Sequence, residues 1–352
     1  MKVQEHTCSL KRFEKALYSR QHHDNIRFLD NIETVYKTTH SEEIDALAAT
    51  QTGAIRRYTQ LTSATSAFNL SEFPLDGVLL LRENLGASMQ IEAAPPEHYV
   101  PIGAMVNTHR HAQFCGQDFE PNMLLQASGG VWDLSFKGGF EYVACVLDKS
   151  ILEDLSETFL QHDIPKAWLA SQPRKTNARL LHSLTQKIDN AFSLAKRYPY
   201  VFKHTGTRQF ITHDIIHCAI KVLGSTQRFY HTLPAPSRRK KAVTRVMDYL
   251  KVHLADLPSI SELCQVAQVS ERTLEYAFKE HFGVSPTKYM NLLRLNRVRY
   301  DLRHNDVNQF GVTEVALSWG FSDLGRFSKY YHALFKELPS HTLRKKRAQQ
   351  KC

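Results

Sequence analysis

The first half of the chain contains two segments that differ in their pattern of apolar and polar residues. Residues 1–67 are polar and compatible with helices, without a strong repeat. Between residues 68 and 148, short apolar runs such as Gly77–Leu81 and Phe140–Leu147 alternate with turn signals. Strands spaced in this way are typical of a sandwich or a small barrel. We therefore expect a β-rich, barrel-like domain over residues 68–148.

The period changes to that of helices in the next stretch. Over residues 149–231, Leu184, Ile188 and Phe192 fall at helical intervals. Residues 232–241 then combine two prolines with a run of four basic residues, which predicts a linker between domains. The fold class that these patterns predict is α+β, with a β-rich N-terminal part and an all-helical C-terminal part.

Helices are easiest to place beyond the linker. Ser259 and Glu262 form an S-x-x-E capping box ahead of a short helix. Ser270 is a suitable N-cap for the following helix, and Gly283 can end that helix in a left-handed conformation. Ser285 followed by proline predicts a further helix that runs to about residue 303. We expect the helical domain to cover residues 242–345, followed by a basic tail at 346–352.

This C-terminal domain contains an internal repeat. A short helix, a three-residue turn and a second helix is the helix-turn-helix pattern, and it occurs twice. Matching residues recur at offsets of 52 and then 53, so one residue is inserted between Ser322 and Phe327. The helix at about 286–303 joins the two units and spans roughly 27 Å. Successive major grooves on one face of a duplex lie about 34 Å apart, so the repeat is compatible with two recognition helices in adjacent grooves.

The charge distribution favours a polyanionic partner for the same region. The net charge is +10, from 45 Lys and Arg and 35 Asp and Glu residues. Residues 237–352 hold 21 of the basic and 11 of the acidic residues, so the whole excess lies there. Nucleic acid and an anionic membrane surface could both attract such a segment. Two matched helical units at this spacing favour DNA.

Residues 238–345 resemble the DNA-binding domain of AraC/XylS transcription regulators. The resemblance rests on the doubled unit, on Ala316–Asp323 completed by Phe327, and on Phe282–Tyr289, although Lys336 replaces an expected glycine. It implies a bacterial, cytoplasmic activator that acts on promoter DNA with RNA polymerase. In such proteins a sensor domain responds to a small-molecule effector, and a helical element, here 149–231, mediates homodimerisation. Leu79–Leu85 faintly resembles the subgroup that contains ethanolamine-operon regulators.

The helical pattern also predicts which side chains would contact DNA. With Leu274 and Phe278 facing inward in the first unit, and Phe327 and Tyr331 in the second, the neighbouring positions face outward. Arginine can bind guanine through two hydrogen bonds and glutamate can accept one from cytosine, whereas lysine often contacts phosphates. The candidate DNA-binding residues are Arg272, Glu275, Tyr276, Lys279, Arg326, Ser328 and Lys329. The basic runs Arg238–Lys241 and Arg344–Arg347 are either phosphate clamps or solvated ends.

Other classes of function have weaker support. His109 and His111 suggest the two-histidine part of a cupin metal motif, but Cys115 and Gly116 occupy the places where its glutamate is expected. A metal site needs a third ligand, so we expect no metal, no cofactor and no enzymatic activity. The alternatives left open are a cupin-like, metal-dependent enzyme and a protein-interaction adaptor, each fused to a DNA-binding module. No run of about 18 apolar residues occurs, so we expect no membrane-spanning helix. The polar residues at the start also lead us to expect no signal peptide.

Overall fold

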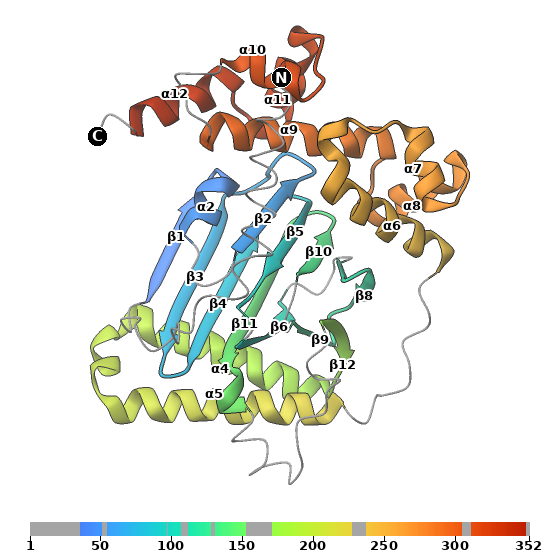
Figure 1. The fold of residues 1–352 in the computed structure, drawn as a ribbon. Helices are drawn as coiled ribbons and strands as arrows, with labels where there is room; N and C mark the ends of the chain where they lie inside the picture. Colours follow the sequence, from blue (N-terminus) through green and yellow to red (C-terminus); the bar gives the residue numbers. More distant parts are fainter. Residues whose placement is uncertain are drawn as a thin grey trace.

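The computed structural model describes residues 36–50, 55–96, 98–106, 112–127, 131–152, 171–226, 237–304 and 311–349. Its N-terminal part contains two antiparallel sheets, and its C-terminal part is helical (Figure 1). Among the described residues, no helix is both long enough and apolar enough to cross a bilayer.

The larger sheet has seven strands in the order β1-β3-β4-β11-β6-β9-β12, and the smaller has five in the order β2-β5-β10-β7-β8. The strands of the larger sheet are β1 (Lys37–Ser41), β3 (Phe68–Leu75), β4 (Val78–Leu85), β6 (Tyr99–Met105), β9 (Met123–Gln126), β11 (Phe140–Asp148) and β12 (Gln172–Lys175). Those of the smaller sheet are β2 (Ile55–Gln60), β5 (Met89–Ala94), β7 (Ala112–Phe114), β8 (Gln117–Phe119) and β10 (Trp132–Phe136). Helix α2 (Ile44–Thr50) connects β1 to β2.

The apolar runs noted in the sequence lie in strands that are covered on both faces. In β4, Leu79 and Leu81 point into the core between the two sheets. The alternate residues Val78 and Leu80 belong to a second core on the other face of the larger sheet. Helices α4 (Ala178–Arg197) and α5 (Thr205–Thr226), joined by the 3-10 helix η3 (Pro199–Lys203), cover that second face. Burial on both sides explains why the strand is apolar at consecutive positions.

A third core holds the helical domain together. Its elements are α6 (Arg238–His253), η5 (Leu254–Asp256), α7 (Ile260–Ala267), α8 (Glu271–Phe282), α9 (Pro286–His304), α10 (Val312–Ser318), α11 (Leu324–Phe335) and α12 (Pro339–Gln349). The predicted repeat is present, because α7 with α8 and α10 with α11 form two helix-turn-helix units on either side of α9. The predicted capping box at Ser259 and the left-handed C-cap at Gly283 are confirmed.

The structure corrects several details of the sequence interpretation. The β-rich part takes in β1 and β2, upstream of the expected boundary at 68, because their residues pair with β3 and β5. The two sheets remain separate in the described ranges, so the β-rich domain is no closed barrel. Strand β12 lies within the stretch 149–231 that was expected to be helical throughout. Of the expected linker 232–241, residues 232–236 lie outside the described residues, and Arg238–Lys241 form the first turn of α6.

Candidate DNA interface

The first recognition helix, α8, is anchored by its apolar face. Leu274 and Phe278 are fully buried, and the Ser270 side chain accepts a hydrogen bond from the Thr273 N–H at the N-terminus. Of the side chains predicted to face outward, Arg272 and Lys279 are exposed and Glu275 is half-buried. Lys279 Nζ lies 2.7 Å from Glu275 Oε1 one turn away, and this hydrogen bond raises the pKa of Lys279 above its ordinary value.

Tyr276 organises the exposed face of α8. The residue is 48% exposed, and two guanidinium groups lie over its ring, with the Cζ of Arg272 at 5.7 Å and that of Arg239 at 5.6 Å from the ring centroid. Arg239 comes from the first turn of α6 and also contacts Glu280 at 3.1 Å. Arginine stacked on an aromatic ring is restricted in orientation. The sequence indicated Arg239 only as one of a basic run, since nothing in the spacing places α6 beside Tyr276.

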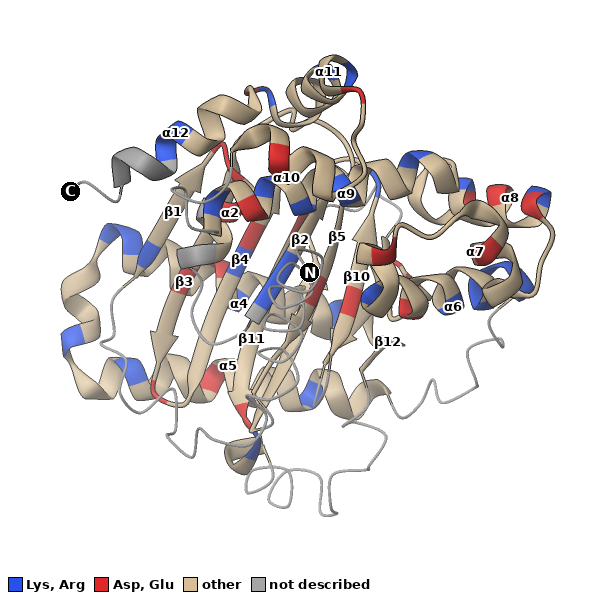
Figure 2. Ribbon diagram, turned by 45° about the horizontal axis from the view of Figure 1, so that its top comes forward, with Lys and Arg blue, Asp and Glu red and all other residues tan. Residues whose placement is uncertain are grey.

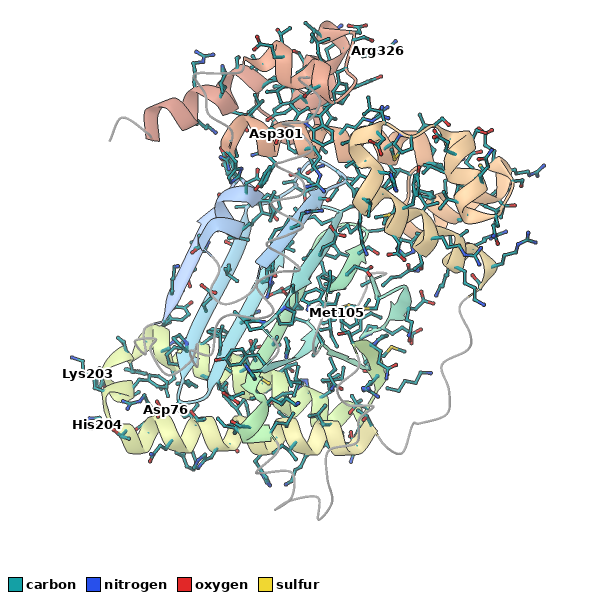
Figure 3. The ribbon with its side chains drawn as sticks, viewed as in Figure 1. Asp76, Met105, Lys203, His204, Asp301 and Arg326 are labelled. Carbon is teal, nitrogen blue, oxygen red and sulfur yellow. The ribbon has the colours of Figure 1, made fainter. Side chains whose placement is uncertain are left out.

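The second recognition helix, α11, begins one residue later than its repeat predicts. Asp323, rather than Ser322, is the N-cap, and its Oδ1 accepts a hydrogen bond from the Arg326 N–H at 2.9 Å. The inserted residue therefore lengthens the turn and leaves Phe327 and Tyr331 buried, as in the first unit. Arg326 and Lys329 are exposed and Ser328 is half-buried. Arg326 lies on the outer side of the helical domain, away from the two sheets (Figure 3).

Tyr330 was missed in the sequence, although it is 47% exposed and lies between Lys329 and the buried Tyr331 on the same helix. It is a large aromatic side chain on the outer surface of α11. Figure 2 shows basic residues on α6, α8, α9 and α12 as well, so both units carry positive charge outside their cores.

Both recognition helices end in the left-handed conformation. At the end of α8 the residue is Gly283, with φ 77°, and at the end of α11 it is Lys336, with φ 60°. The two N–H groups donate equivalent hydrogen bonds, to Lys279 O at 3.0 Å and His332 O at 2.9 Å. The replacement of glycine by lysine therefore leaves the geometry of this helix end unchanged, contrary to the expectation of a less defined last turn.

A left-handed lysine predicts a stabilising substitution. A non-glycine residue in this conformation costs about 1 kcal/mol, and Lys336 is exposed. We expect Lys336→Gly to raise the free energy of unfolding of the helical domain by about 0.5–1 kcal/mol. Urea denaturation followed by circular dichroism measures this change. Lys329→Gly, which places glycine in the middle of α11, is the control and should lower the free energy of unfolding by about 1 kcal/mol.

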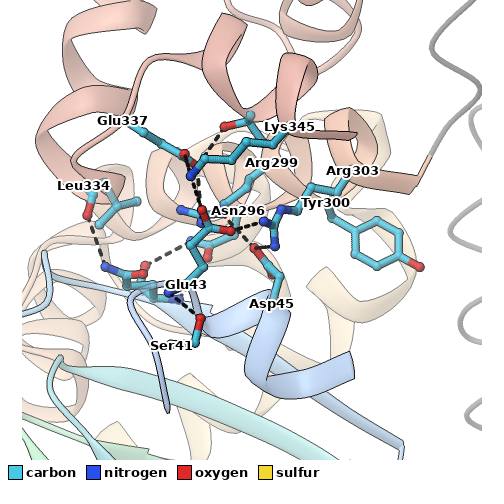
Figure 4. Close-up of polar contacts among 12 residues, drawn as sticks. Ser41, Glu43, Asp45, Asn296, Arg299, Tyr300, Arg303, Leu334, Glu337 and Lys345 are labelled. Carbon is cyan, nitrogen blue, oxygen red and sulfur yellow. Dashed lines mark hydrogen bonds and ion pairs between the residues drawn. The ribbon is translucent and has the colours of Figure 1, made fainter. Parts of the chain in front are cut away.

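The helical domain is joined to the N-terminal part by a cluster of ion pairs (Figure 4). Arg299 Nε lies 2.7 Å from Asp45 Oδ2, and Arg299 Nη2 lies 3.3 Å from Glu337 Oε1. Glu43 accepts hydrogen bonds from Arg303 and Lys345. Burial raises the pKa of Glu43, but these cations more than offset that effect and hold it below its ordinary value. The N-terminal residues in this cluster flank or begin α2, and their partners lie on α9, at the end of α11 and on α12.

The outer face of the smaller sheet also contacts the helical domain. Tyr289 of α9 donates a hydrogen bond to Gln90 of β5, and Ser135 of β10 lies 3.2 Å from His281 of α8. Burial raises the pKa of the neighbouring Asp133 to about 6, with the Lys251 cation opposing that shift. Burial and two nearby lysines lower the pKa of His281 to about 4. Polar side chains of β5 and β10 thus contact α9 and α8 directly.

The suspected metal residues cannot be placed, because His109 and His111 lie outside the described residues. Cys115 follows β7 in the turn before β8 and packs against the core between the two sheets. Burial and Asp133 raise its pKa to about 12, so its thiol is protonated at neutral pH. No cluster of three possible metal ligands occurs among the described residues.

Comparisons with known proteins agree with the helical architecture. Residues 263–345 match a family described as a helix-turn-helix domain. The chain is 35% identical over 108 residues to the XylDLEGF operon transcriptional activator of Pseudomonas putida, which covers 31% of this chain and 34% of that protein. It is 35% identical over 97 residues to the transcriptional activator RhaS of Enterobacter sp. (strain 638), covering 28% and 34% of the two chains.

A solved structure, the AraC-like transcriptional activator CuxR, aligns with 76% of this chain and 96% of its own at 11% identity, with a TM-score of 0.40. The chain spans about a third of the length of these two curated relatives. The family match over residues 263–345 extends across both helix-turn-helix units. Residues 263–345 of this chain therefore form a helix-turn-helix domain, and the chain is similar over about a third of its length to these two transcriptional activators.

Proposed function

We propose that this protein is a sequence-specific transcription regulator of the AraC/XylS type, and that it binds promoter DNA through two successive major grooves. The observation that carries the proposal is the pair of matched units on one spacer helix. Helix α9 has 19 residues and is about 28 Å long at 1.5 Å per residue. Each unit adds an exposed recognition helix, so the two can reach grooves about 34 Å apart.

The roles of individual residues follow from their exposure. We assign base contacts to Arg272 and Glu275 in the first unit and to Arg326 in the second, because they lie in the first turns of α8 and α11. Tyr276 and Ser328 complete these faces. Lys279 and Lys329 are assigned to phosphates, since their ammonium groups are one or two turns further along.

The test is binding of the purified protein to sheared genomic DNA at about physiological salt, with sequencing of the recovered fragments. Proteins that bind DNA through charge alone lose most of their affinity under these conditions. We expect a shared motif with two elements about one helical turn apart. Uniform recovery of fragments without a motif would contradict the proposal.

Substitutions of two exposed residues on α8 distinguish base-specific contacts from electrostatic binding to the DNA phosphates. Arg272→Ala should weaken binding to the recovered motif by about 1–3 kcal/mol and relax the preference at one base pair. Lys279→Ala should weaken binding to all sequences about equally. It should also reduce the magnitude of the slope of log affinity against log salt concentration by about 1. Fluorescence anisotropy at several salt concentrations measures both. Equal effects of the two variants on the motif and on random DNA would argue against the assignment.

The remaining parts of the proposal concern the signal and the partners. We infer that the two-sheet domain responds to a small-molecule effector, for which ethanolamine is a first compound to test, and that the protein activates transcription with RNA polymerase in the cytoplasm. Residues 149–231, which include α4 and α5, would mediate homodimerisation. Binding of the effector must favour one placement of the helical domain over another, because a ligand can shift an equilibrium only by its differential affinity. We propose no catalytic activity, metal or cofactor.

A further inference from the structure

The smaller sheet contacts the C-terminal ends of both recognition helices. We propose that this sheet fixes the distance between the two recognition helices. Gln60 and Lys137 bind the last turns of α11 and α8, and so determine which spacing between two DNA elements the protein can bind. The inference rests on the proposed function and deepens it. It implies that the N-terminal domain helps to set the relative position of the two recognition helices on DNA.

Lys137 holds the end of the first recognition helix. It directly follows β10, and its Nζ donates to the carbonyl oxygens of Lys279 at 3.3 Å and Glu280 at 2.5 Å. Lys279 O also accepts a hydrogen bond from the N–H of Gly283, whereas carbonyls closer to the end of a helix have no partner within the helix. A cation at this position also interacts favourably with the helix dipole. The contact of Ser135 with His281 lies on the same turn of α8.

Gln60 holds the end of the second recognition helix. Its Nε2 donates to the carbonyl oxygen of Leu334 at 3.1 Å, and the side chain is buried. The backbone of Gln60 exchanges two further hydrogen bonds of 2.9 Å with the side chain of Asn296 on α9. The next residue, Leu61, is buried in the core of the helical domain. The end of β2 is therefore inserted between α9 and α11.

The two contacts come from one rigid element. Met89 of β5 pairs with Gln60 of β2 on one side and with Phe136 of β10 on the other. Gln60 and Lys137 thus lie at the same end of the sheet, separated by two strand spacings, or about 10 Å. A hydrogen-bonded ladder between them resists changes in that separation. Two recognition helices that are held at their ends by this sheet cannot move independently.

This restraint matters because DNA spacing changes in large steps. One inserted base pair displaces the second element by about 3.4 Å and rotates it by about 35°. Helix α9 joins the two units, and Leu257, ahead of α7, lies against Gly320 after α10. Neither of these connections contacts the carbonyls at the C-terminal ends of α8 and α11 that Lys137 and Gln60 bind. With the sheet docked, such a step must break contacts at one recognition helix. We expect the docked protein to discriminate sharply between spacings.

The experiment measures Kd of the full-length protein for its recovered motif and for versions with one base pair inserted or removed between the two elements. For the wild type we expect binding to weaken at least about 30-fold at either altered spacing, comparable to the loss of a good base contact. For the double variant Gln60→Ala/Lys137→Met we expect the Kd at an altered spacing to exceed the Kd at the native spacing by at most about 5-fold. Lys137→Arg, which keeps the cation, should retain the wild-type profile.

The matched control is Lys175→Met/Gln186→Ala, the same two changes of side chain on β12 and α4. It should leave the spacing profile unchanged. Thermal unfolding verifies that each variant is folded; if the double variant is not, Lys137→Met alone is used, because this side chain is only half-buried. An unchanged profile in a folded variant, or an equal loss of affinity at every spacing, would overturn the inference. A wild type that recovers no two-element motif would instead refute the proposed function.

Discussion

Replacing Glu83 by alanine is expected to lower the free energy of unfolding of the N-terminal domain by about 3–5 kcal/mol, because it leaves a buried cation without its counter-ion. Glu83 is completely buried and lies 2.8 Å from the Nη1 of Arg56. Its two carboxylate oxygens also accept hydrogen bonds from the hydroxyls of Tyr58 and Tyr142. The Arg56 guanidinium donates to Tyr142 as well, at 2.7 Å. The guanidinium and the two tyrosine hydroxyls lose hydration on folding, and all three depend on this carboxylate.

Thermal or urea unfolding measures the effect. Glu83→Gln keeps an acceptor for the tyrosines but loses the charge, so its free energy of unfolding should lie between those of the wild type and the alanine variant. The control is Glu141→Ala, because the pair of Glu141 with Arg82 is partly exposed and such pairs contribute about 0–1 kcal/mol. A loss below about 1 kcal/mol for Glu83→Ala would show that the cluster contributes little to stability.

This buried cluster illustrates what the sequence could and could not predict. Strands β4 and β11 were visible as apolar runs, because both of their faces are covered. Strands β1 and β2 were not, since β1 is mostly exposed and β2 carries consecutive arginines in KTTHS and IRRYTQ. Arg56 and Arg57 look like solvated positions in the sequence. Their burial is possible only because Glu83 and Glu92, from other strands, neutralise them.

The recognition helices were predicted with more success than their surroundings. Caps and buried positions are local signals, so Ser270, Leu274 and Phe278 could be placed from spacing alone. Asp323 was missed as the N-cap because the inserted residue could lie anywhere between Ser322 and Phe327. The position of Arg239 beside Tyr276 and the contacts of Gln60 with Leu334 join residues far apart in the chain. Nothing in a single sequence indicates such pairs.

Replacing Arg299 by alanine is expected to separate the helical domain from the N-terminal part. Only 4% of the Arg299 side chain is exposed, and it pairs with Asp45 and with Glu337. Its guanidinium also lies over the ring of Phe335 at 4.4 Å. After its removal Arg303 still lies 3.7 Å from Asp45 and Lys345 still lies 2.9 Å from Glu337, so the expected cost is that of the lost charged hydrogen bonds, about 1–3 kcal/mol. Since Asp45 lies across the domain boundary, much of that cost should weaken docking.

Differential scanning calorimetry distinguishes this effect from simple destabilisation. Domains that are coupled by a strong interface unfold together, whereas uncoupled domains unfold in separate transitions. We expect one transition in the wild type and two in Arg299→Ala. Arg299→Lys keeps the charge but lacks the planar guanidinium. Its two transitions should lie closer together in temperature than those of Arg299→Ala. Arg245→Ala, at an exposed arginine of α6 whose contacts stay within the helical domain, should keep a single transition. A single, lowered transition in Arg299→Ala would mean that the ion pairs stabilise the protein without controlling how its two parts dock.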